Sequence, residues 1–282
     1  EIVAKLHCDV LVCTIERGDD AFIANADFVF QEKDVISIVA SPRNANDFFR
    51  KIDYKINSVK DVMIVGGGEI THYLCDILQR SGIAIKIIEK NAEKCEELCT
   101  TWPDVSVING DAVDQEILLE EGLANCGAFA ALTNLDEENI LLSLFAKSAG
   151  KGKLVTKINR IDFDTVIKKL DLDSIIYPKN ITSDMIVRYV RAMKNTIGSN
   201  VETLYNIIKG KIEAAEFIVK ENSPIAGVPL AELKFKDNVL IAAVLRERKV
   251  IIPRGHDIIQ PGDAVVVVSN LMQLHDIADI LK

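Results

Sequence analysis

A hydrophobic segment that runs into three consecutive glycines constrains the fold of this chain more than any other feature. Residues 62–65 are apolar, residues 66–68 are glycines, and a helix-forming stretch begins at Glu69. This order is typical of dinucleotide-binding folds, in which the glycines let backbone N–H groups approach a pyrophosphate. Thr71 stands where the third glycine of that fingerprint usually lies, so the pattern indicates the fold more firmly than the ligand.

An acidic residue, Glu89, ends the next apolar segment, 21 residues after Gly68. A carboxylate in this place accepts hydrogen bonds from ribose hydroxyls and repels a 2′-phosphate. We therefore predict a preference for NAD(H) or an adenosine nucleotide over NADP(H). The positive charge of Lys90, beside Glu89, would reduce this preference. An alternative interpretation is a surface ion pair between Glu89 and Lys90.

Strands and helices alternate between residues 57 and 198, which predicts a parallel sheet. A long apolar helix from about residue 182 to 196 then serves either as a last packing helix or as a dimerisation helix between lobes. Six strands that alternate with helices are typical of a doubly wound sheet. We expect these strands at residues 61–65, 84–88, 105–108, 128–132, 154–158 and 174–176.

The two ends of the chain resemble each other without a gap. Residues 9–47 align with residues 238–276 at a constant offset of 229. Self-similarity at a fixed offset indicates repeated architecture, so we expect the tail of one unit followed by a complete second unit. The identical pairs are Val10/Val239, Leu11/Leu240, Arg17/Arg246, Ile23/Ile252, Gln31/Gln260, Asp34/Asp263 and Asp47/Asp276.

The resulting fold prediction is an α/β protein: a doubly wound parallel-sheet (Rossmann-like) domain at residues 57–198, flanked by two small α+β lobes at residues 1–56 and 199–282. A helix should begin at Pro42, and a closing helix should span residues 271–281. In the lobes we expect strands at residues 10–15, 21–23, 35–39, 212–219, 239–245, 250–252 and 264–268.

Composition narrows the classes of function. A net charge of −9 argues against a nucleic-acid partner, and 49% apolar residues suffice for a buried core. No apolar segment approaches the roughly 18–20 residues that span a bilayer, so we expect no direct membrane insertion. The six cysteines form no Cys-x-x-Cys motif, which predicts reduced thiols and no metal site.

Further candidate ligand-binding residues follow later strands of the sheet. Asp111 and Ala112 follow the third strand, Thr133 and Asn134 follow the fourth, and Lys157 ends the fifth. The carboxyl edge of such a sheet is where ligands bind. Helix capping is the alternative for the polar residues after the third and fourth strands, and a solvated charge is the alternative for Lys157.

The succession of motifs along the whole chain resembles the TrkA/RCK (KTN) family of cytosolic regulators of potassium transporters and channels. The small lobe contributes Ile241-Ala242-Ala243, Ile252-Pro253-Arg254-Gly255 and Gln260-Pro261-Gly262-Asp263. The α/β domain contributes Val65-Gly66-Gly67-Gly68-Glu69-Ile70, Ile88-Glu89-Lys90, Gly110-Asp111-Ala112, Ala131-Leu132-Thr133-Asn134 and Glu138-Asn139.

The duplicated lobe is similar to the C-terminal part of a two-repeat, Trk-type potassium uptake regulatory subunit. The resemblance implies no catalysis. It implies binding of NAD(H) or ATP/ADP, with AMP also considered, which changes a homo-oligomer (a dimer or a higher ring) and so gates a membrane potassium transporter or channel subunit. Such a protein is cytoplasmic and lies at the inner face of the membrane through its partner.

The resemblance also assigns roles to site residues. By match to the family motif, the glycine turn with Glu69 and Ile70 would face the pyrophosphate, and Glu89 would bind the adenosine ribose. Asp111 and Ala112 would lie at the adenine end and Thr133 at the distal half. Lys157 stands where the family commonly has arginine. The full candidate set is Gly66, Gly67, Gly68, Glu69, Ile70, Thr71, Glu89, Lys90, Asp111, Ala112, Thr133, Asn134 and Lys157.

Two other classes of function are compatible with the sequence. An NAD-dependent oxidoreductase could use the Tyr-x3-Lys spacing of Tyr205 and Lys209, although we expect these residues in an ordinary amphipathic helix without an acid–base partner. An assembly protein with an empty nucleotide site is the other alternative, and Thr71 is the residue that favours it.

Overall fold

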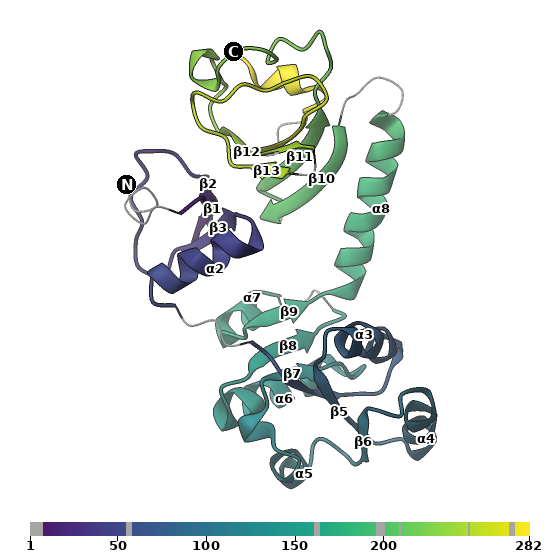
Figure 1. Cartoon of the computed structure of the whole chain (residues 1–282). Coiled ribbons are helices and arrows are strands. Elements are labelled where there is room, and N and C mark those ends of the chain that lie inside the picture. The colour runs from purple at the N-terminus through teal and green to yellow at the C-terminus, as the bar shows by residue number, and fades with distance from the viewer. Residues whose placement is uncertain are drawn as a thin grey trace. The chain divides into compact units, whose positions relative to one another are not determined.

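Figure 1 shows a computed structural model of the chain, which describes residues 8–54, 58–160, 164–195, 201–208, 210–247, 249–270 and 274–282. The chain divides into two compact units, one formed by residues 57–183 and one by residues 1–56 together with residues 184–282. The predicted domain boundaries after residues 56 and 198 stay predictions.

The unit of residues 57–183 is built on a parallel sheet of six strands in the order β6-β5-β4-β7-β8-β9. The expected doubly wound sheet is confirmed, because chain order reverses between β4 and β7. A crevice at the carboxyl ends of the strands is expected at such a switch point. The strands are β4 (Asp61–Val65), β5 (Ala84–Glu89), β6 (Ser106–Asn109), β7 (Ala128–Ala131), β8 (Lys153–Lys157) and β9 (Ser174–Ile176).

Helices cover both faces of this sheet, as Figure 1 shows. Met63 of β4 packs with Leu118 and Leu142 on one face, whereas Ile64 packs with Cys75 and Leu98 on the other. Neighbouring residues of a strand point to opposite faces, so β4 is buried on both sides. The helices are α3 (Glu69–Arg80), α4 (Ala92–Thr101), α5 (Gln115–Glu120), η1 (Leu123–Asn125), α6 (Asp136–Ala149), α7 (Asp164–Ile167) and η2 (Lys168–Leu170).

A long helix, α8 (Pro178–Asn195), follows the last strand of the sheet. It begins four residues before the expected start, because proline is well suited to the first turn of a helix. Several of its apolar side chains remain exposed in the chain: Ile181, Met185, Ile186, Val187, Tyr189, Val190 and Met193.

The first lobe, residues 8–54, has a three-stranded antiparallel sheet of order β2-β1-β3 and one helix. The second lobe, residues 201–282, has a five-stranded antiparallel sheet of order β10-β11-β14-β12-β13. The first lobe contains β1 (Leu11–Arg17), β2 (Asp20–Ile23), β3 (Val35–Val39) and α2 (Pro42–Lys51). The second lobe contains β10 (Val201–Ile208), β11 (Ile212–Ile218), η3 (Leu230–Glu232), β12 (Val239–Arg246), β13 (Lys249–Ile251), β14 (Ala264–Ser269) and η4 (Ile277–Ile280).

Two expectations for the second lobe are wrong. Tyr205 lies in strand β10, not in an amphipathic helix, because β10 pairs with β11; Lys209 lies outside the described residues. The expected closing helix is also absent from residues 274–282, where only the short 3-10 turn η4 forms. Asp276 and Asp279 form a capping box that starts this turn in the middle of the predicted helix. Residues 271–273 lie outside the described part of the chain.

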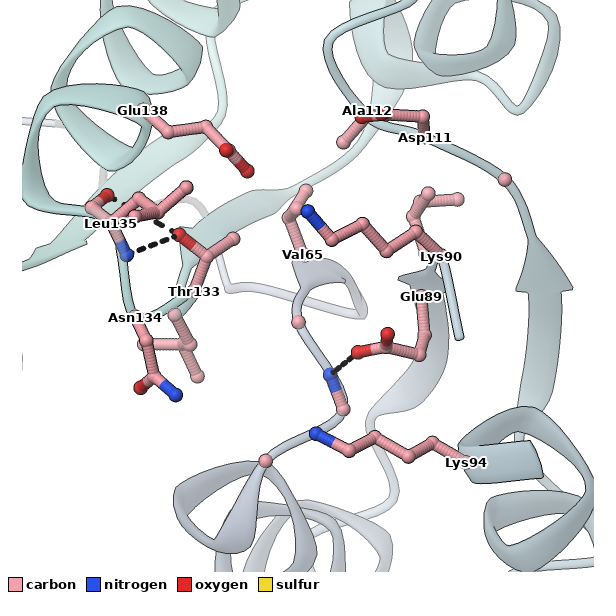
Figure 2. A pocket seen from close by; sticks show the side chains of 16 residues that line it. Val65, Glu89, Lys90, Lys94, Asp111, Ala112, Thr133, Asn134, Leu135 and Glu138 are labelled. Atoms are coloured by element: carbon pink, nitrogen blue, oxygen red, sulfur yellow. Dashed lines mark hydrogen bonds between the residues drawn. The ribbon is translucent and has the colours of Figure 1, made fainter. Parts of the chain in front are cut away.

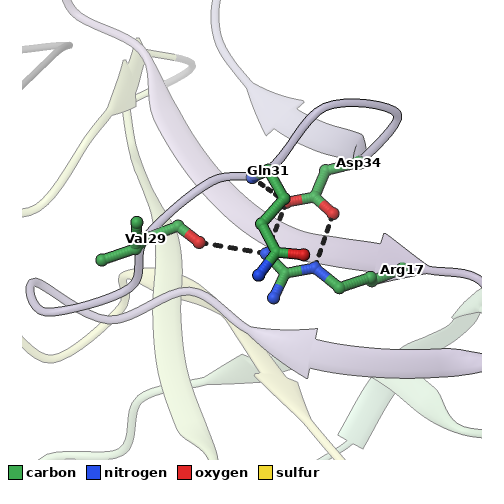
Figure 3. Close-up of polar contacts among 4 residues, drawn as sticks. All are labelled: Arg17, Val29, Gln31 and Asp34. Atoms are coloured by element: carbon green, nitrogen blue, oxygen red, sulfur yellow. Dashed lines mark hydrogen bonds and ion pairs between the residues drawn. The ribbon is translucent and has the colours of Figure 1, made fainter.

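An arginine–aspartate pair shows that the two lobes share one design. In the first lobe, Arg17 Nε and a terminal nitrogen donate to the two carboxylate oxygens of Asp34 at 2.8 and 2.7 Å (Figure 3). Arg246 and Asp263, at the offset of 229, repeat the contact at 2.8 and 2.6 Å. Lys33 has a φ of 71°, close to the 88° of its equivalent Gly262. The first lobe therefore keeps the same turn conformation with a lysine in place of glycine.

The two lobes pack on each other through equivalent positions. Leu11, Cys13 and Val39 of the first lobe belong to one apolar cluster with their second-lobe equivalents Leu240, Ala242 and Val268. Burial within this cluster raises the pKa of the Cys13 thiol to about 12. The repeated sheets therefore bury the same face against each other.

Candidate functional site

A cavity of about 180 Å³ opens at the carboxyl ends of β4, β5, β6 and β7 (Figure 2). It lies where the strand order reverses, as expected for this kind of sheet. Most of the predicted site residues line it: Gly66, Gly67, Gly68, Glu89, Lys90, Asp111, Ala112, Thr133 and Asn134. The cavity is also lined by Val65, Ile88, Lys94, Gly110, Leu132, Leu135 and Glu138.

The glycine turn is held closely between its neighbouring strands. Gly66 has a φ of 100°, which favours glycine, and a Cβ there would lie 3.1 Å from the backbone of Leu132 and Thr133. The N–H of Gly66 donates to the carbonyl oxygen of Ile88 at 3.0 Å. The turn therefore has little freedom at its first residue, and the next residues face the cavity.

Glu89 is buried at the end of β5, with 8% of its surface exposed, so the surface ion pair with Lys90 is wrong. One carboxylate oxygen, Oε2, accepts a hydrogen bond from the N–H of Gly67 at 2.7 Å. The other, Oε1, accepts from the N–H of Asn91 at 2.8 Å. Each oxygen keeps a second lone pair, so Glu89 can hold the glycine turn and still accept a ribose hydroxyl.

Thr71 is fully buried and does not line the cavity. Its hydroxyl donates to the carbonyl oxygen of Gly66 at 2.5 Å. This hydrogen bond stabilises the glycine turn from the side of the protein interior. Glu69 and Ile70 do not line the cavity either. Gly68 gives α3 no side-chain cap, which leaves the first N–H groups of a 12-residue helix as donors for an anion.

Asn139, which lies on α6 and is fully buried, organises the loop after β7. Its Oδ1 accepts from the N–H and the hydroxyl of Thr133 at 2.9 and 2.7 Å. Its Nδ2 donates to the carbonyl oxygens of Thr133 and Lys157 at 3.0 and 2.9 Å. Thr133 and Asn134 are thereby placed at the wall of the cavity by a residue outside the candidate set.

Capping explains part of the polar sequence at this edge. Asp114 caps α5 by accepting from the N–H of Glu116, whereas Asp111 accepts from the N–H of Val113 within its own loop. Asp136 is the first residue of α6, and its carboxylate accepts from the N–H groups of Asn159 and Arg160 rather than capping the helix. Local backbone bonds therefore fix Asp111 in a loop at the cavity rather than at a helix end.

Lys157 is buried and does not line the cavity, so its interpretation as a solvated charge is wrong. Burial lowers the pKa of its ammonium group, while the nearby Asp136 raises it. Its Nζ donates to Oδ1 of Asn134 at 3.2 Å. Lys157 therefore supports a residue of the cavity wall from behind.

Lys94 lines the cavity although sequence reasoning did not single it out. It lies in the first turn of α4, where the side chain of Asn91 accepts from its N–H at 3.0 Å. Figure 2 shows its side chain reaching toward the glycine turn. The capping residue Asn91, two residues after the end of β5, is a sequence signal that could have placed Lys94 at this edge.

The described residues contain no group of three or more His, Cys, Asp or Glu side chains able to hold a metal ion. The Cys95 thiol is buried and donates to the carbonyl oxygen of Glu89 at 3.3 Å, whereas Cys99 is exposed. None of the helices in the described ranges has the length and apolar character needed to cross a bilayer.

The fold and the cavity define a Rossmann-like domain followed by a small antiparallel lobe. Two family models match these parts: the TrkA-N domain over residues 62–178 and the TrkA-C domain over residues 214–282. The chain belongs to the TrkA family, as the resemblance in its sequence motifs indicated.

Relatives with curated names agree with this assignment. Trk system potassium uptake protein TrkA homolog 1 of Methanosarcina mazei is 29% identical over 266 residues, which cover 94% of this chain and 58% of the relative. Trk system potassium uptake protein TrkA of Haemophilus influenzae is 30% identical over 264 residues, which cover 93% of this chain and 56% of the relative. The chain thus spans less than two thirds of the length of these relatives.

Among solved structures, the GsuK channel matches with a TM-score of 0.54 at 15% identity. The match covers 96% of this chain and 46% of the channel chain. At this identity the likeness concerns the fold alone, and it extends over the parallel sheet and both lobes.

Proposed function

We propose that this chain is the nucleotide-sensing part of a cytoplasmic regulatory subunit that controls a membrane potassium transporter or channel of the Trk type. Membership of the TrkA family supports this proposal, as do the relatives named as Trk system potassium uptake proteins. The partner would hold the subunit at the inner face of the membrane.

The ligand we propose is an adenine nucleotide, with NAD(H) first and ATP, ADP or AMP as the other members of the class. The observation that carries this proposal is the contact between the buried Glu89 carboxylate and the glycine turn. This contact supports a role for Glu89 as the ribose acceptor. The neighbouring turn has open space, since a Cβ on Gly68 would meet no atom within 4 Å, so a ligand can approach the backbone closely.

In this proposal each part of the cavity meets one part of the nucleotide. The glycine turn and the start of α3 bind the pyrophosphate, and Glu89 with Lys90 binds the adenosine ribose. Asp111 and Ala112 lie at the adenine end, and Thr133 with Asn134 lies at the distal half. Thr71 and Lys157 act through their neighbours, since each contacts a lining residue without lining the cavity.

Regulation would follow from differential affinity. A nucleotide changes the arrangement of an oligomer only if it binds one arrangement more tightly, and a coupling of about 1–3 kcal/mol alters the equilibrium about 5- to 150-fold. The exposed apolar side chains of α8 support a homo-oligomer, because burying them against a second copy would remove them from water.

The proposal includes no catalysis. Tyr205, the residue that favoured an oxidoreductase, lies on β10 and does not line the cavity. An acid–base residue for hydride transfer would have to lie near the nucleotide. Tyr205 of the Tyr-x3-Lys spacing is not among the residues that line the cavity.

A binding series tests the proposal. The melting temperature is measured with NADH, NAD, ATP, ADP and AMP, since a ligand at 100 times its dissociation constant stabilises by about 2.7 kcal/mol. We expect a shift with at least one of these, and none with the Gly68→Asp variant. No shift with any nucleotide would favour an assembly protein with an empty site, and NADH oxidation with a carbonyl compound would favour the oxidoreductase.

A further inference from the structure

We propose that this cavity accepts a phosphate on the 2′-oxygen of the adenosine ribose, and that Lys94, together with Lys90, provides this tolerance. NADPH would then bind about as tightly as NADH, contrary to the exclusion expected from Glu89 alone. The inference rests on the proposed nucleotide site and deepens it by naming the class of dinucleotide that the site admits.

Both oxygens of the Glu89 carboxylate are already bound by the backbone. Oε2 and Oε1 of Glu89 each accept a backbone hydrogen bond, from Gly67 at 2.7 Å and from Asn91 at 2.8 Å. Two N–H dipoles therefore already point at the negative charge, which reduces the field that it projects into the cavity. A carboxylate held in this way repels an incoming phosphate less than one that faces the ligand alone.

Two cations, Lys90 and Lys94, lie near Glu89 in the lining of the cavity. Lys90 follows Glu89 directly, and Lys94 lies one helical turn further on; both line the cavity. In the described part of the chain neither ammonium group has a carboxylate within ion-pair distance, unlike Lys86, which pairs with Glu121 at 2.7 Å. Both side chains are exposed at the cavity mouth and are therefore available to an anionic ligand.

The side chains of Lys90 and Lys94 point in different directions (Figure 2). In Figure 2 the nitrogen of Lys94 lies beside the glycine turn, on the side of the cavity where Glu89 contacts Gly67. The nitrogen of Lys90 points into the cavity toward Val65. The two other lining carboxylates, Asp111 and Glu138, enter from the loop after β6 and from α6.

The charges on the ribose side therefore favour an anion. On the side of the cavity where Glu89 lies, two ammonium groups and one carboxylate leave a net charge of one positive unit, whereas Asp111 and Glu138 on the other walls make the lining as a whole negative by one unit. A phosphomonoester carries about −1.5 to −2 at pH 7. An arginine near the ribose is the usual partner of a 2′-phosphate, and a lysine can donate charge-assisted hydrogen bonds to the same oxygens.

Isothermal titration calorimetry on the full chain tests this inference with two matched pairs of ligands: NADH with NADPH, and 5′-AMP with adenosine 2′,5′-bisphosphate. In the unaltered protein we expect the dissociation constants within each pair to agree within about threefold. Lys94→Ala should raise the dissociation constant of NADPH about fivefold and that of NADH less than about twofold, as expected for an exposed charge pair. The same difference should shrink at high salt.

Controls separate charge from folding. Lys94→Gln keeps most of the side-chain length and should give the same selective loss as Lys94→Ala. Lys151→Ala removes an exposed lysine from the loop before β8, away from the carboxyl edge of the sheet. It should not change the affinity for NADH or for NADPH. Thermal melting without ligand verifies that each variant is folded.

Three results would overturn the inference. Tight NADH binding with NADPH more than tenfold weaker would do so while leaving the proposed nucleotide site intact. An equal loss of NADH and NADPH in Lys94→Ala would show that Lys94 contacts the pyrophosphate instead. If none of the four nucleotides bound, this inference would fail, and the proposed function would fail with it if ATP and ADP gave no binding either.

Discussion

The Glu89 carboxylate accepts a hydrogen bond from the N–H of Gly67 at 2.7 Å, which ties the end of β5 to the turn after β4. The residue expected to bind the ribose is thus also part of the turn expected to bind the pyrophosphate. A ligand that hydrogen-bonds to Glu89 therefore acts on the conformation of the glycine turn, and the two halves of the site are not independent.

Glu89→Gln should lower both stability and nucleotide affinity. The amide offers one oxygen where the carboxylate offers two, so the N–H of Gly67 or of Asn91 loses its acceptor. We expect a loss of about 1–3 kcal/mol in the free energy of unfolding, measured by urea denaturation. The control Glu97→Gln changes an exposed residue of α4 and should have little effect; equal losses in both variants would contradict this role for Glu89.

Gly67→Ala should destabilise the protein, whereas Gly68→Ala should not. A Cβ at Gly67 would lie 2.6 Å from Cδ1 of Leu98 and 3.2 Å from Oε2 of Glu89, while a Cβ at Gly68 meets nothing within 4 Å. Overpacking of this kind costs about 1–3 kcal/mol. Chemical denaturation of the two variants side by side measures the difference, and similar midpoints would show that Leu98 moves aside freely.

Gly68→Asp should abolish nucleotide binding without unfolding the protein. The open space around Gly68 accommodates the side chain, but the carboxylate would occupy the place of the pyrophosphate at the start of α3. Calorimetry with the tightest ligand of the series measures the loss, and Gly68→Ala, which adds bulk without charge, should retain more affinity than Gly68→Asp. Unchanged affinity in Gly68→Asp would show that the pyrophosphate lies elsewhere.

Thr71→Val should reduce stability by about 1 kcal/mol and change nucleotide affinity by less than about threefold. The hydroxyl of Thr71 bonds the carbonyl oxygen of Gly66 inside the protein and does not line the cavity. Thr100→Val is a suitable control, because Thr100 makes a similar bond to Glu96 on an exposed helix face. A tenfold loss of affinity in Thr71→Val would mean that Thr71 contacts the ligand after all.

Acid unfolding should depend on Asp34. The hydrogen bond from Arg17 is the main reason why the pKa of Asp34 is lowered to about 2, against an unfolded value of about 3.9. A lowered folded pKa contributes stability that is present above pH 4 and is lost as the pH falls toward 2. Melting temperatures between pH 5 and 2 should therefore fall less steeply in Asp34→Asn than in the unaltered protein.

The equivalent Asp263 extends this prediction to the second lobe. Its burial raises its pKa, but the hydrogen bonds from Arg246 and from the N–H of Gln260 outweigh that effect and lower it overall. Asp263→Asn should reduce the acid dependence in the same direction. The exposed Asp19→Asn serves as the control for both variants, and a slope that it shares with them would contradict the role of the ion pairs.

The parallel sheet could be predicted closely from the sequence. Its strands are buried on both faces and so read as continuous apolar segments, and β4 and β9 begin and end at the predicted residues. Strand β10 could not be predicted in this way, because its identity depends on pairing with β11 across the sheet. Pairing between strands is a tertiary effect that local propensity does not record.

The cavity was predicted in outline for a similar reason. The carboxyl ends of parallel strands meet at one edge of the sheet. The backbone topology therefore brings together the residues after β4, β5, β6 and β7, whatever the orientation of their side chains. The directions of the side chains were beyond the sequence: Thr71 turns into the core, Lys157 lies behind Asn134, and Lys94 enters the cavity from a neighbouring helix.

The packing of the two lobes through equivalent positions has a consequence for evolution. Two separate copies that meet across a twofold axis must place the same residue on both sides of the interface. Lobes joined in one polypeptide escape this constraint, and here Cys13 in one lobe corresponds to Ala242 in the other. Their association is also intramolecular, so dilution does not separate them, and each lobe is free to diverge while the pair stays together.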